Sequence, residues 1–118
     1  MQLNWTSRLP LTSEKVQTIR EIAGVYKLIY YQLSDEGYYV YYVGQADNLR
    51  DRLYQHLPSN EANSCCSKYL KNYNCYFRAA AVSRQSDRDG IEVTLYNKYK
   101  PECVEKIPDV EPIDINFE

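Results

Sequence analysis

Two neighbouring runs of aromatic and β-branched residues place the strongest constraint on the fold. The first run covers residues 24–33 and stops at the polar segment 34–37, and the second covers residues 38–43 and ends at Gly44. Such runs are typical of strands, and a short Ser-Asp-Glu-Gly segment between them favours a tight turn. The sequence therefore predicts an antiparallel hairpin, in which alternate side chains of each strand share one face of the sheet.

Further elements follow the hairpin in the order helix, helix, strand, helix. Leucines recur every four residues within 48–57, where Asp47 is placed to cap a helix and Pro58 to end it. The other predicted elements are a helix over 64–71, a strand over 75–82 and a helix from Asp87 or Asp89 to Tyr99. This order predicts an α+β fold with a three-stranded antiparallel sheet flanked by helices.

The length of the chain allows one domain with a substantial core. At 118 residues it is too short for two independent domains. We assign the domain to residues 23–101, preceded by an extension with a short helix over 1–22 and followed by a tail over 102–118. In the tail, every second residue from Ile113 to Phe117 is apolar, which predicts a short edge strand or a docking segment.

Composition and charge exclude several classes of protein. A net charge of −2 and a pI near 5.4 argue against non-specific binding of duplex through a broad basic surface, so any contact with nucleic acid must be local. No stretch approaches the roughly 20 apolar residues of a membrane-spanning helix. The first residues lack the basic start and apolar run of a secretory signal. We expect a cytoplasmic protein without a membrane partner.

The four cysteines, Cys65, Cys66, Cys75 and Cys103, show none of the paired spacings of zinc sites. We predict that they are reduced structural thiols. A thiol redox protein built on the adjacent pair is disfavoured, because vicinal cysteines are strained as a disulfide and no Cys-x-x-Cys is present.

Three polar side chains on the predicted helices are candidates for chemistry. Arg52 and His56 are four residues apart, so they lie one turn apart on a face beside the leucine stripe. Glu92 shares a helix face with Leu95 and Tyr99, and a carboxylate on such a semi-buried face requires a reason. Taken alone, each of the three is more often an ordinary helix residue.

The spacing of these residues from two tripeptides indicates a family. Gly24-Val25-Tyr26 on the first strand and Tyr42-Val43-Gly44 on the second resemble the two halves of the GIY-YIG signature. The family's arginine falls ten residues after the second-motif tyrosine, at Arg52, and its histidine or tyrosine four further on, at His56. Its glutamate, followed nine residues later by proline, matches Glu92 and Pro101. Over residues 23–101 the chain therefore resembles the GIY-YIG nucleases, whose order of elements is the same.

The resemblance implies a metal-dependent endonuclease that hydrolyses phosphodiester bonds of nucleic acid, with DNA as the first expectation. Glu92 would bind Mg²⁺ or Mn²⁺, and Arg52 would stabilise charge on the phosphate in the transition state. Tyr26 would take a proton from water, with a pKa lowered from about 10 by a nearby cation or metal. His56 would share that role as a proton acceptor, and Tyr42 would orient phosphate or water by its hydroxyl.

Other positions of the resemblance concern structure and departures from the family. Gly24 and Gly44 would be structural, allowing either a turn or the close approach of a neighbour. Val104 stands three residues after the proline, where the family often has asparagine, and Gln45 stands where some relatives have lysine. A catalytically inactive relative is therefore a possible outcome.

A binding module with the same fold is the alternative, with an aromatic face that stacks on single-stranded bases or on a protein partner. Such a module would keep its affinity without metal and release its substrate intact. The sequence leaves open DNA or RNA, and whether a homodimer or a partner protein supplies specificity. Cations that could form a local rim, or equally be ordinary solvated charges, are Arg50, Arg52, Lys68, Lys71, Arg78, Arg84 and Arg88.

Overall fold

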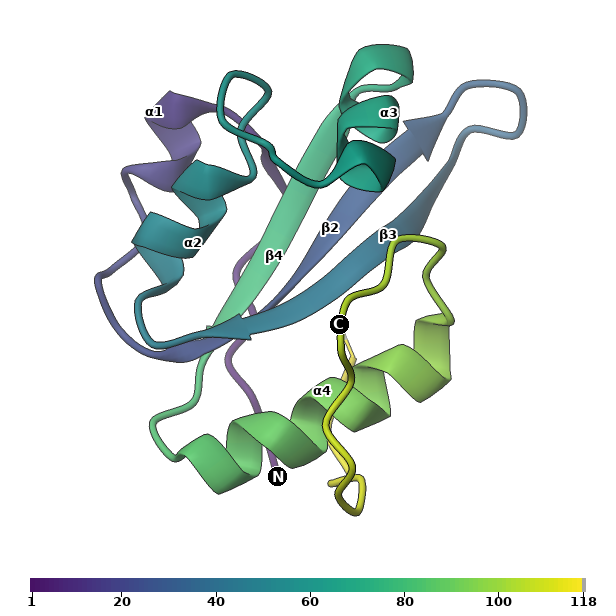
Figure 1. The fold of residues 1–118 in the computed structure, drawn as a ribbon. Helices are drawn as coiled ribbons and strands as arrows, with labels where there is room; N and C mark the ends of the chain where they lie inside the picture. Colours follow the sequence, from purple (N-terminus) through teal and green to yellow (C-terminus); the bar gives the residue numbers. More distant parts are fainter. Residues whose placement is uncertain (118) are drawn as a thin grey trace.

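A four-stranded antiparallel sheet with the strand order β1-β4-β2-β3 forms the centre of the computed structural model, which describes residues 1–117 (Figure 1). Its strands are β1 Leu9–Pro10, β2 Gly24–Gln32, β3 Gly37–Ala46 and β4 Cys75–Ala81. The hairpin of β2 and β3 and the third long strand, β4, confirm the prediction from the sequence. The sheet has one strand more than predicted, because β1 pairs with β4 over only two residues and is too short to show an alternating pattern.

Four helices complete the structure, α1 Ser13–Val16, α2 Leu49–Gln55, α3 Ser64–Asn72 and α4 Gln85–Tyr99, which confirms the α+β prediction. The cap of α2 is Asn48 and not Asp47, because the Asn48 side chain accepts a hydrogen bond from the backbone of Asp51. Helix α4 begins at Gln85, before the predicted start at Asp87 or Asp89. Within residues 1–117, no helix has the length and apolar character needed to cross a membrane.

The helices divide between the two faces of the sheet (Figure 1). Helices α1, α2 and α3 share one core with Tyr26, Leu28 and Phe77. Helix α4 covers the opposite face and shares a second core with Val25 and Val43. Neighbouring residues of a strand point to opposite faces, so Val25 and Tyr26 of β2 enter different cores. The Tyr26 side chain is thereby directed towards the α1–α3 side of the sheet.

The two terminal segments lie together on the α4 side of the sheet. The backbone N–H of Leu3 donates to Asn116 Oδ1 over 2.6 Å, and Asn116 Nδ2 donates to the Leu3 carbonyl over 2.9 Å. Residues 113–117 do not form a strand, and their alternate apolar side chains pack onto the second core instead. Further along the N-terminal segment, Leu11 and Val16 are buried in the first core.

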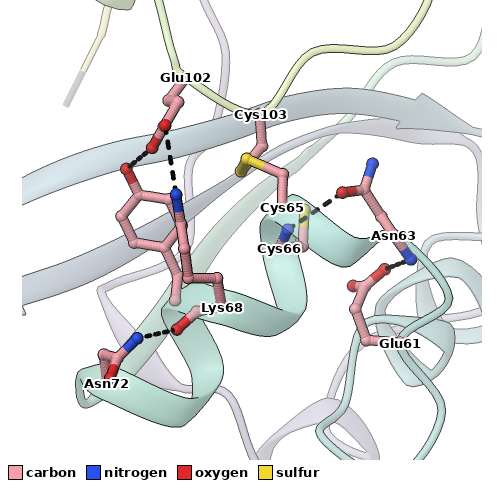
Figure 2. The surroundings of a disulfide bond; sticks show 9 residues. Glu61, Asn63, Cys65, Cys66, Lys68, Asn72, Glu102 and Cys103 are labelled. Carbon is pink, nitrogen blue, oxygen red and sulfur yellow. Dashed lines mark hydrogen bonds and ion pairs between the residues drawn. A yellow bond between two sulfur atoms is a disulfide. The ribbon is translucent and has the colours of Figure 1, made fainter.

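Cys65 of α3 and Cys103, which follows α4, form a disulfide with 5.5 Å between their Cα atoms (Figure 2). The prediction of reduced thiols is therefore wrong for this pair. The two residues are 38 positions apart, so no spacing pattern announces them. They meet because Cys103 donates a backbone hydrogen bond to the Tyr41 carbonyl of β3, against which α3 also packs. Cys66 and Cys75 are free, as predicted.

Candidate active site

Tyr26 of β2, Tyr42 of β3 and His56 at the end of α2 meet on the α1–α3 side of the sheet. The ring centroids lie 6.1 Å apart for Tyr26 and Tyr42, 5.4 Å for Tyr26 and His56, and 5.1 Å for Tyr42 and His56. The Tyr26 hydroxyl and His56 Nε2 share a hydrogen bond of 2.8 Å. All three side chains are buried. The structure thus brings together three residues that are far apart in the sequence.

The two motif glycines permit close approaches rather than turns. Gly44 lies directly opposite Tyr26 in the register of β2 and β3, and a Cβ at Gly44 would lie 2.6 Å from the Tyr26 hydroxyl oxygen. A Cβ at Gly24 would lie 2.2 Å from the Ala80 carbonyl oxygen. Neither glycine has a positive φ, so neither is needed for its backbone freedom. Gly44 leaves the space that the Tyr26 phenol occupies.

His56 has a second partner on the side away from Tyr26. Its Nδ1 lies 2.5 Å from Glu61 Oε2, and the other carboxylate oxygen of Glu61 accepts the backbone N–H of Asn63 over 3.0 Å. The side chains of His56 and Glu61 are only 6% and 4% exposed. Cys66 places its sulfur within 4.8 Å of ligand atoms of both residues, but the hydrogen bonds satisfy the carboxylate without an ion. Sequence reasoning missed Glu61, which lies in a loop without periodicity.

Burial sets the acidity of the two tyrosines. It raises the pKa of Tyr26 well above its usual value, Tyr42 raises it further, and the positive charge of Arg52 partly opposes both. Burial also raises the pKa of Tyr42, reinforced by the hydrogen bond that its hydroxyl donates to Glu105. Both phenols are therefore protonated in the resting protein. A lowered pKa at Tyr26, which the role of a lone base demands, is not produced by the side chains around it.

Glu92 of α4 is a buried carboxylate with a side-chain amide as its partner. Its exposed fraction is 8%, and Gln45 Nε2 donates to Glu92 Oε1 over 2.9 Å and to Asp89 Oδ1 over 2.8 Å. Burial raises the pKa of Glu92, the Gln45 hydrogen bond lowers it, and the charges of Asp89 and Glu105 raise it again. Gln45 thus holds two carboxylates of α4.

Arg52 of α2 lines a pocket of about 230 Å³ together with His56, Glu61 and Glu105. Within the described chain its guanidinium has no hydrogen-bond or ion-pair partner. Its charge nevertheless lowers the pKa of both Tyr26 and Glu92, so its field reaches both. Arg52 is therefore a cation of this region whose hydrogen-bond donors are not engaged by the described part of the chain.

The tail contributes an unexpected acid. Val104 is 42% exposed. Its neighbour Glu105 accepts the hydrogen bond from the Tyr42 hydroxyl and lines the pocket beside Arg52. No sequence pattern indicates Glu105, because the disulfide at Cys103 and the backbone contact to β3 bring it to the site.

Several cations proposed for a rim are used inside the structure instead. Arg50 Nε donates to the Ile19 carbonyl over 2.7 Å, and Arg78 Nε donates to the Thr6 carbonyl over 2.8 Å. Arg88 is only 4% exposed, and its guanidinium donates to two backbone carbonyls and to two side chains. Arg88 is therefore a structural residue rather than a surface charge.

The donor set around Glu92 fits a hard divalent cation. Carboxylate oxygens are the ligands that Mg²⁺ and Mn²⁺ prefer. Burial is the largest cause of the raised pKa of Glu92, and the negative charges of Asp89 and Glu105 raise it further. A bound cation would favour the ionised form against both. Glu92 could hold such an ion, with Asp89 next to it on the same Gln45 amide.

Comparison with solved structures identifies the fold. The GIY-YIG N-terminal endonuclease domain of UvrC from Thermotoga maritima bound to magnesium is similar to 78% of this chain over 93% of its own length, with a TM-score of 0.59 and 21% sequence identity. A point mutant of that domain bound to its catalytic divalent cation gives the same TM-score over 79% of this chain and 93% of its own, at 20% identity. Neither models of known protein families nor the sequences of curated proteins match the chain. The chain therefore has the fold of the GIY-YIG endonuclease domain.

Proposed function

We propose that the protein is a metal-dependent endonuclease of the GIY-YIG type, which hydrolyses phosphodiester bonds of nucleic acid, with DNA as the first candidate substrate. The observation that carries the proposal is the meeting of Tyr26, Tyr42 and His56 beside Arg52 and within the field of a buried Glu92. Among residues 1–117, Arg52 has no hydrogen-bond or ion-pair partner. The fold shared with an endonuclease domain supports the same conclusion.

Glu92 is the proposed metal residue. A divalent ion held there, Mg²⁺ or Mn²⁺, would supply positive charge for the phosphate and for the departing 3′ oxygen. The Gln45 amide fixes the position of Glu92 Oε1 through the 2.9 Å hydrogen bond, so the carboxylate is oriented before any ion arrives. The neighbouring charge of Asp89 strengthens the attraction for a cation.

Arg52 is the proposed clamp for the phosphate in the transition state. A guanidinium presents a planar set of donors that matches non-bridging phosphate oxygens, and its charge does not titrate at ordinary pH. Since Arg52 is without a partner among residues 1–117, binding a phosphate would break no interaction within the described chain. Its electrostatic effect on both Tyr26 and Glu92 supports a position between the proton acceptor and the metal residue.

The proton of the attacking water is proposed to pass through Tyr26 to His56. Burial disfavours a free phenolate at Tyr26. If the Tyr26 oxygen takes the proton of water while its own proton moves 2.8 Å to His56 Nε2, the phenolate does not accumulate. Tyr42, whose hydroxyl is held by Glu105, would orient phosphate or water beside this path.

Specificity is proposed to come from outside this small site. The net charge is −2, and Arg50, Arg78 and Arg88 are occupied by contacts within the chain, so few cations are left to follow a nucleic-acid backbone. A homodimer or a partner protein would supply the wider contact surface. We place the protein in the cytoplasm, where its disulfide would have to form against a reducing environment.

A catalytically inactive binding module is the second candidate, and Glu105 is the observation that favours it. This carboxylate of the protein's own tail holds Tyr42 and shares the pocket with Arg52, where a substrate phosphate would have to enter. A binding module would retain its affinity without metal and leave its ligand uncut.

The two candidates are separated by cleavage of end-labelled branched, duplex and single-stranded DNA, and of RNA, in Mg²⁺, in Mn²⁺ and with chelator. We expect metal-dependent products that Glu92→Gln and Arg52→Ala each reduce by about 10²-fold or more. The matched controls are Glu14→Gln and Arg20→Ala, which alter exposed residues of the N-terminal segment and should leave the rate unchanged. Absence of cleavage for every substrate, with binding that is the same in metal and in chelator, would overturn the nuclease and support the binding module.

A further inference from the structure

Glu61 has no part in the proposed reaction, yet it is among the most enclosed carboxylates of the site. Its side chain is 4% exposed, and both of its oxygens are engaged, Oε2 with His56 Nδ1 at 2.5 Å and Oε1 with the backbone N–H of Asn63 at 3.0 Å. A buried carboxylate is costly to maintain without strong partners. The burial of the Glu61 carboxylate therefore requires a functional explanation.

We propose that Glu61 is a positioning residue, which holds the proton of neutral His56 on Nδ1 and so leaves Nε2 free to accept the proton of Tyr26. This role rests on the proposed nuclease function and deepens it. An ionised carboxylate only accepts hydrogen bonds, so the nitrogen that faces Glu61 must carry the proton. The opposite nitrogen of a neutral imidazole then has a lone pair, and it is the one that faces the Tyr26 hydroxyl at 2.8 Å.

Tyr26 and His56 form the path of the proton, and Glu61 holds the ring at its far nitrogen. The water O–H bond breaks as a new O–H bond forms on Tyr26, and the original Tyr26 O–H bond breaks as an N–H bond forms on His56 Nε2. The oxygen of the water uses its freed electron pair to attack phosphorus. The bond between phosphorus and the 3′ oxygen breaks, and its electron pair leaves with the 3′ oxygen. His56 becomes an imidazolium that is protonated on both nitrogens, and the negative charge of Glu61 stabilises it. The proton later returns from Nε2 to the departing group or to solvent.

The local structure holds Glu61 in place for this role. Helix α2 gives way to a turn in which the backbone N–H groups of Asn60 and Glu61 both donate to the Leu57 carbonyl over 2.9 Å. Asn63 then donates to Glu61 and caps α3 through its own side chain, which accepts from the backbone of Cys66 over 3.0 Å (Figure 2). The carboxylate is thus tied to the ends of two helices and is positioned independently of substrate.

The ring of His56 can be observed directly, because it is the only histidine in the chain. In ¹⁵N-labelled parent protein, the ring-nitrogen shifts at neutral pH should show a protonated Nδ1 and an unprotonated Nε2. Glu61→Gln keeps the size of the side chain but replaces the obligatory acceptor by an amide that also donates. In this variant the ring should show a mixture of the two tautomers. A parent protein whose neutral ring carries its proton on Nε2 would overturn the proposal without any variant.

Cleavage kinetics test the consequence for the reaction. Glu61→Gln should lower kcat by about 10- to 100-fold, the usual effect of losing the residue that orients a functional histidine, and change KM less than twofold. The matched control is Glu102→Gln, an exposed carboxylate in the tail that hydrogen-bonds Lys68 and should leave both constants unchanged. If the parent is active and Glu61→Gln has the same kcat, the positioning role of Glu61 is refuted and the nuclease proposal stands. An inactive parent would refute the nuclease proposal and this inference with it, whereas the NMR measurement would still report the tautomer.

Discussion

Replacing Gly44 by alanine should displace Tyr26 and so lower the proposed nuclease activity. The added Cβ would lie 2.6 Å from the Tyr26 hydroxyl oxygen and 2.7 Å from Cζ. Non-bonded heavy atoms rest at about 3.5–4.0 Å, so the phenol must move by roughly 1 Å. Tyr26 is fully buried, and its neighbours have to shift with it.

Two magnitudes follow from this displacement. A shift of about 1 Å stretches the 2.8 Å hydrogen bond to His56 beyond the range of a good hydrogen bond, and misplacement on this scale costs about 10²-fold in rate. Overpacking of a buried position typically costs about 1–3 kcal/mol of unfolding free energy. A domain of ordinary stability survives that loss, so Gly44→Ala should fold while its kcat falls about 100-fold.

Steady-state cleavage and urea unfolding measured on the same preparations test this reasoning. Gly37→Ala is the matched control in the same hairpin, because its added Cβ would meet atoms of the exposed side chains of Tyr39 and Asp35. It should change kcat less than twofold. In the background of Tyr26→Phe, which already lacks the hydroxyl, Gly44→Ala should add little further loss of rate. Parental kcat in Gly44→Ala alone would refute the claim that the glycine serves the position of Tyr26.

Two further predictions concern Glu92 and the disulfide. Glu92→Gln should reduce cleavage by about 10²-fold or more yet stabilise the metal-free protein. Burial raises the pKa of Glu92, so its ionised form is the costly one in the folded state. The parent is destabilised as pH rises from about 4.3, the pKa of a glutamate in the unfolded chain, through the raised pKa of Glu92 in the folded protein. The variant should therefore be more stable than the parent in urea unfolding at pH 7 and equally stable below pH 4. Equal stabilities of the two proteins at both pH values would contradict this expectation. Cys103→Ser should lower the unfolding free energy by about 4 kcal/mol for a loop of 38 residues closed by Cys65–Cys103. Alkylation of the denatured, unreduced parent should label two thiols, and labelling of all four would contradict the bond.

The long elements were predictable from the sequence because each has a repeated local signal. The aromatic and β-branched runs of β2 and β3 and the leucine repeat of α2 each extend over several residues, which is enough to define a period. β1 covers two residues and exists only because Leu9 and Pro10 pair with β4, so no local pattern specifies it. The alternation after Ile113 was informative about burial but not about conformation, since these residues reach the second core without forming a strand.

The limits of prediction are similar within the site. Tyr26, Tyr42 and His56 stand at recognisable spacings, and the structure brings them together. Glu61 and Glu105 could not be found in this way. A turn after α2 places Glu61 in the site, and the tail that the disulfide links to α3 places Glu105 there. The protonation state of Tyr26 and Tyr42 was also not predictable from the sequence, because burial governs their pKa values and burial is a property of the folded chain.

The balance of charge in the site indicates how metal should affect affinity. Glu92 lies in the field of two other acids, Asp89 and Glu105, and is opposed by a single cation, Arg52. A phosphodiester adds another negative charge to a region in which carboxylates already outnumber cations, and like charges at close range in a partly buried site repel strongly. A divalent ion would reverse this balance, so a nuclease built on these residues should bind its substrate more tightly in Mg²⁺, or in Ca²⁺ if that ion supports binding without cleavage, than in chelator. A binding module that uses its aromatic rings would gain nothing from the ion. The sign of the metal effect on affinity therefore separates the two functions even before any product is detected.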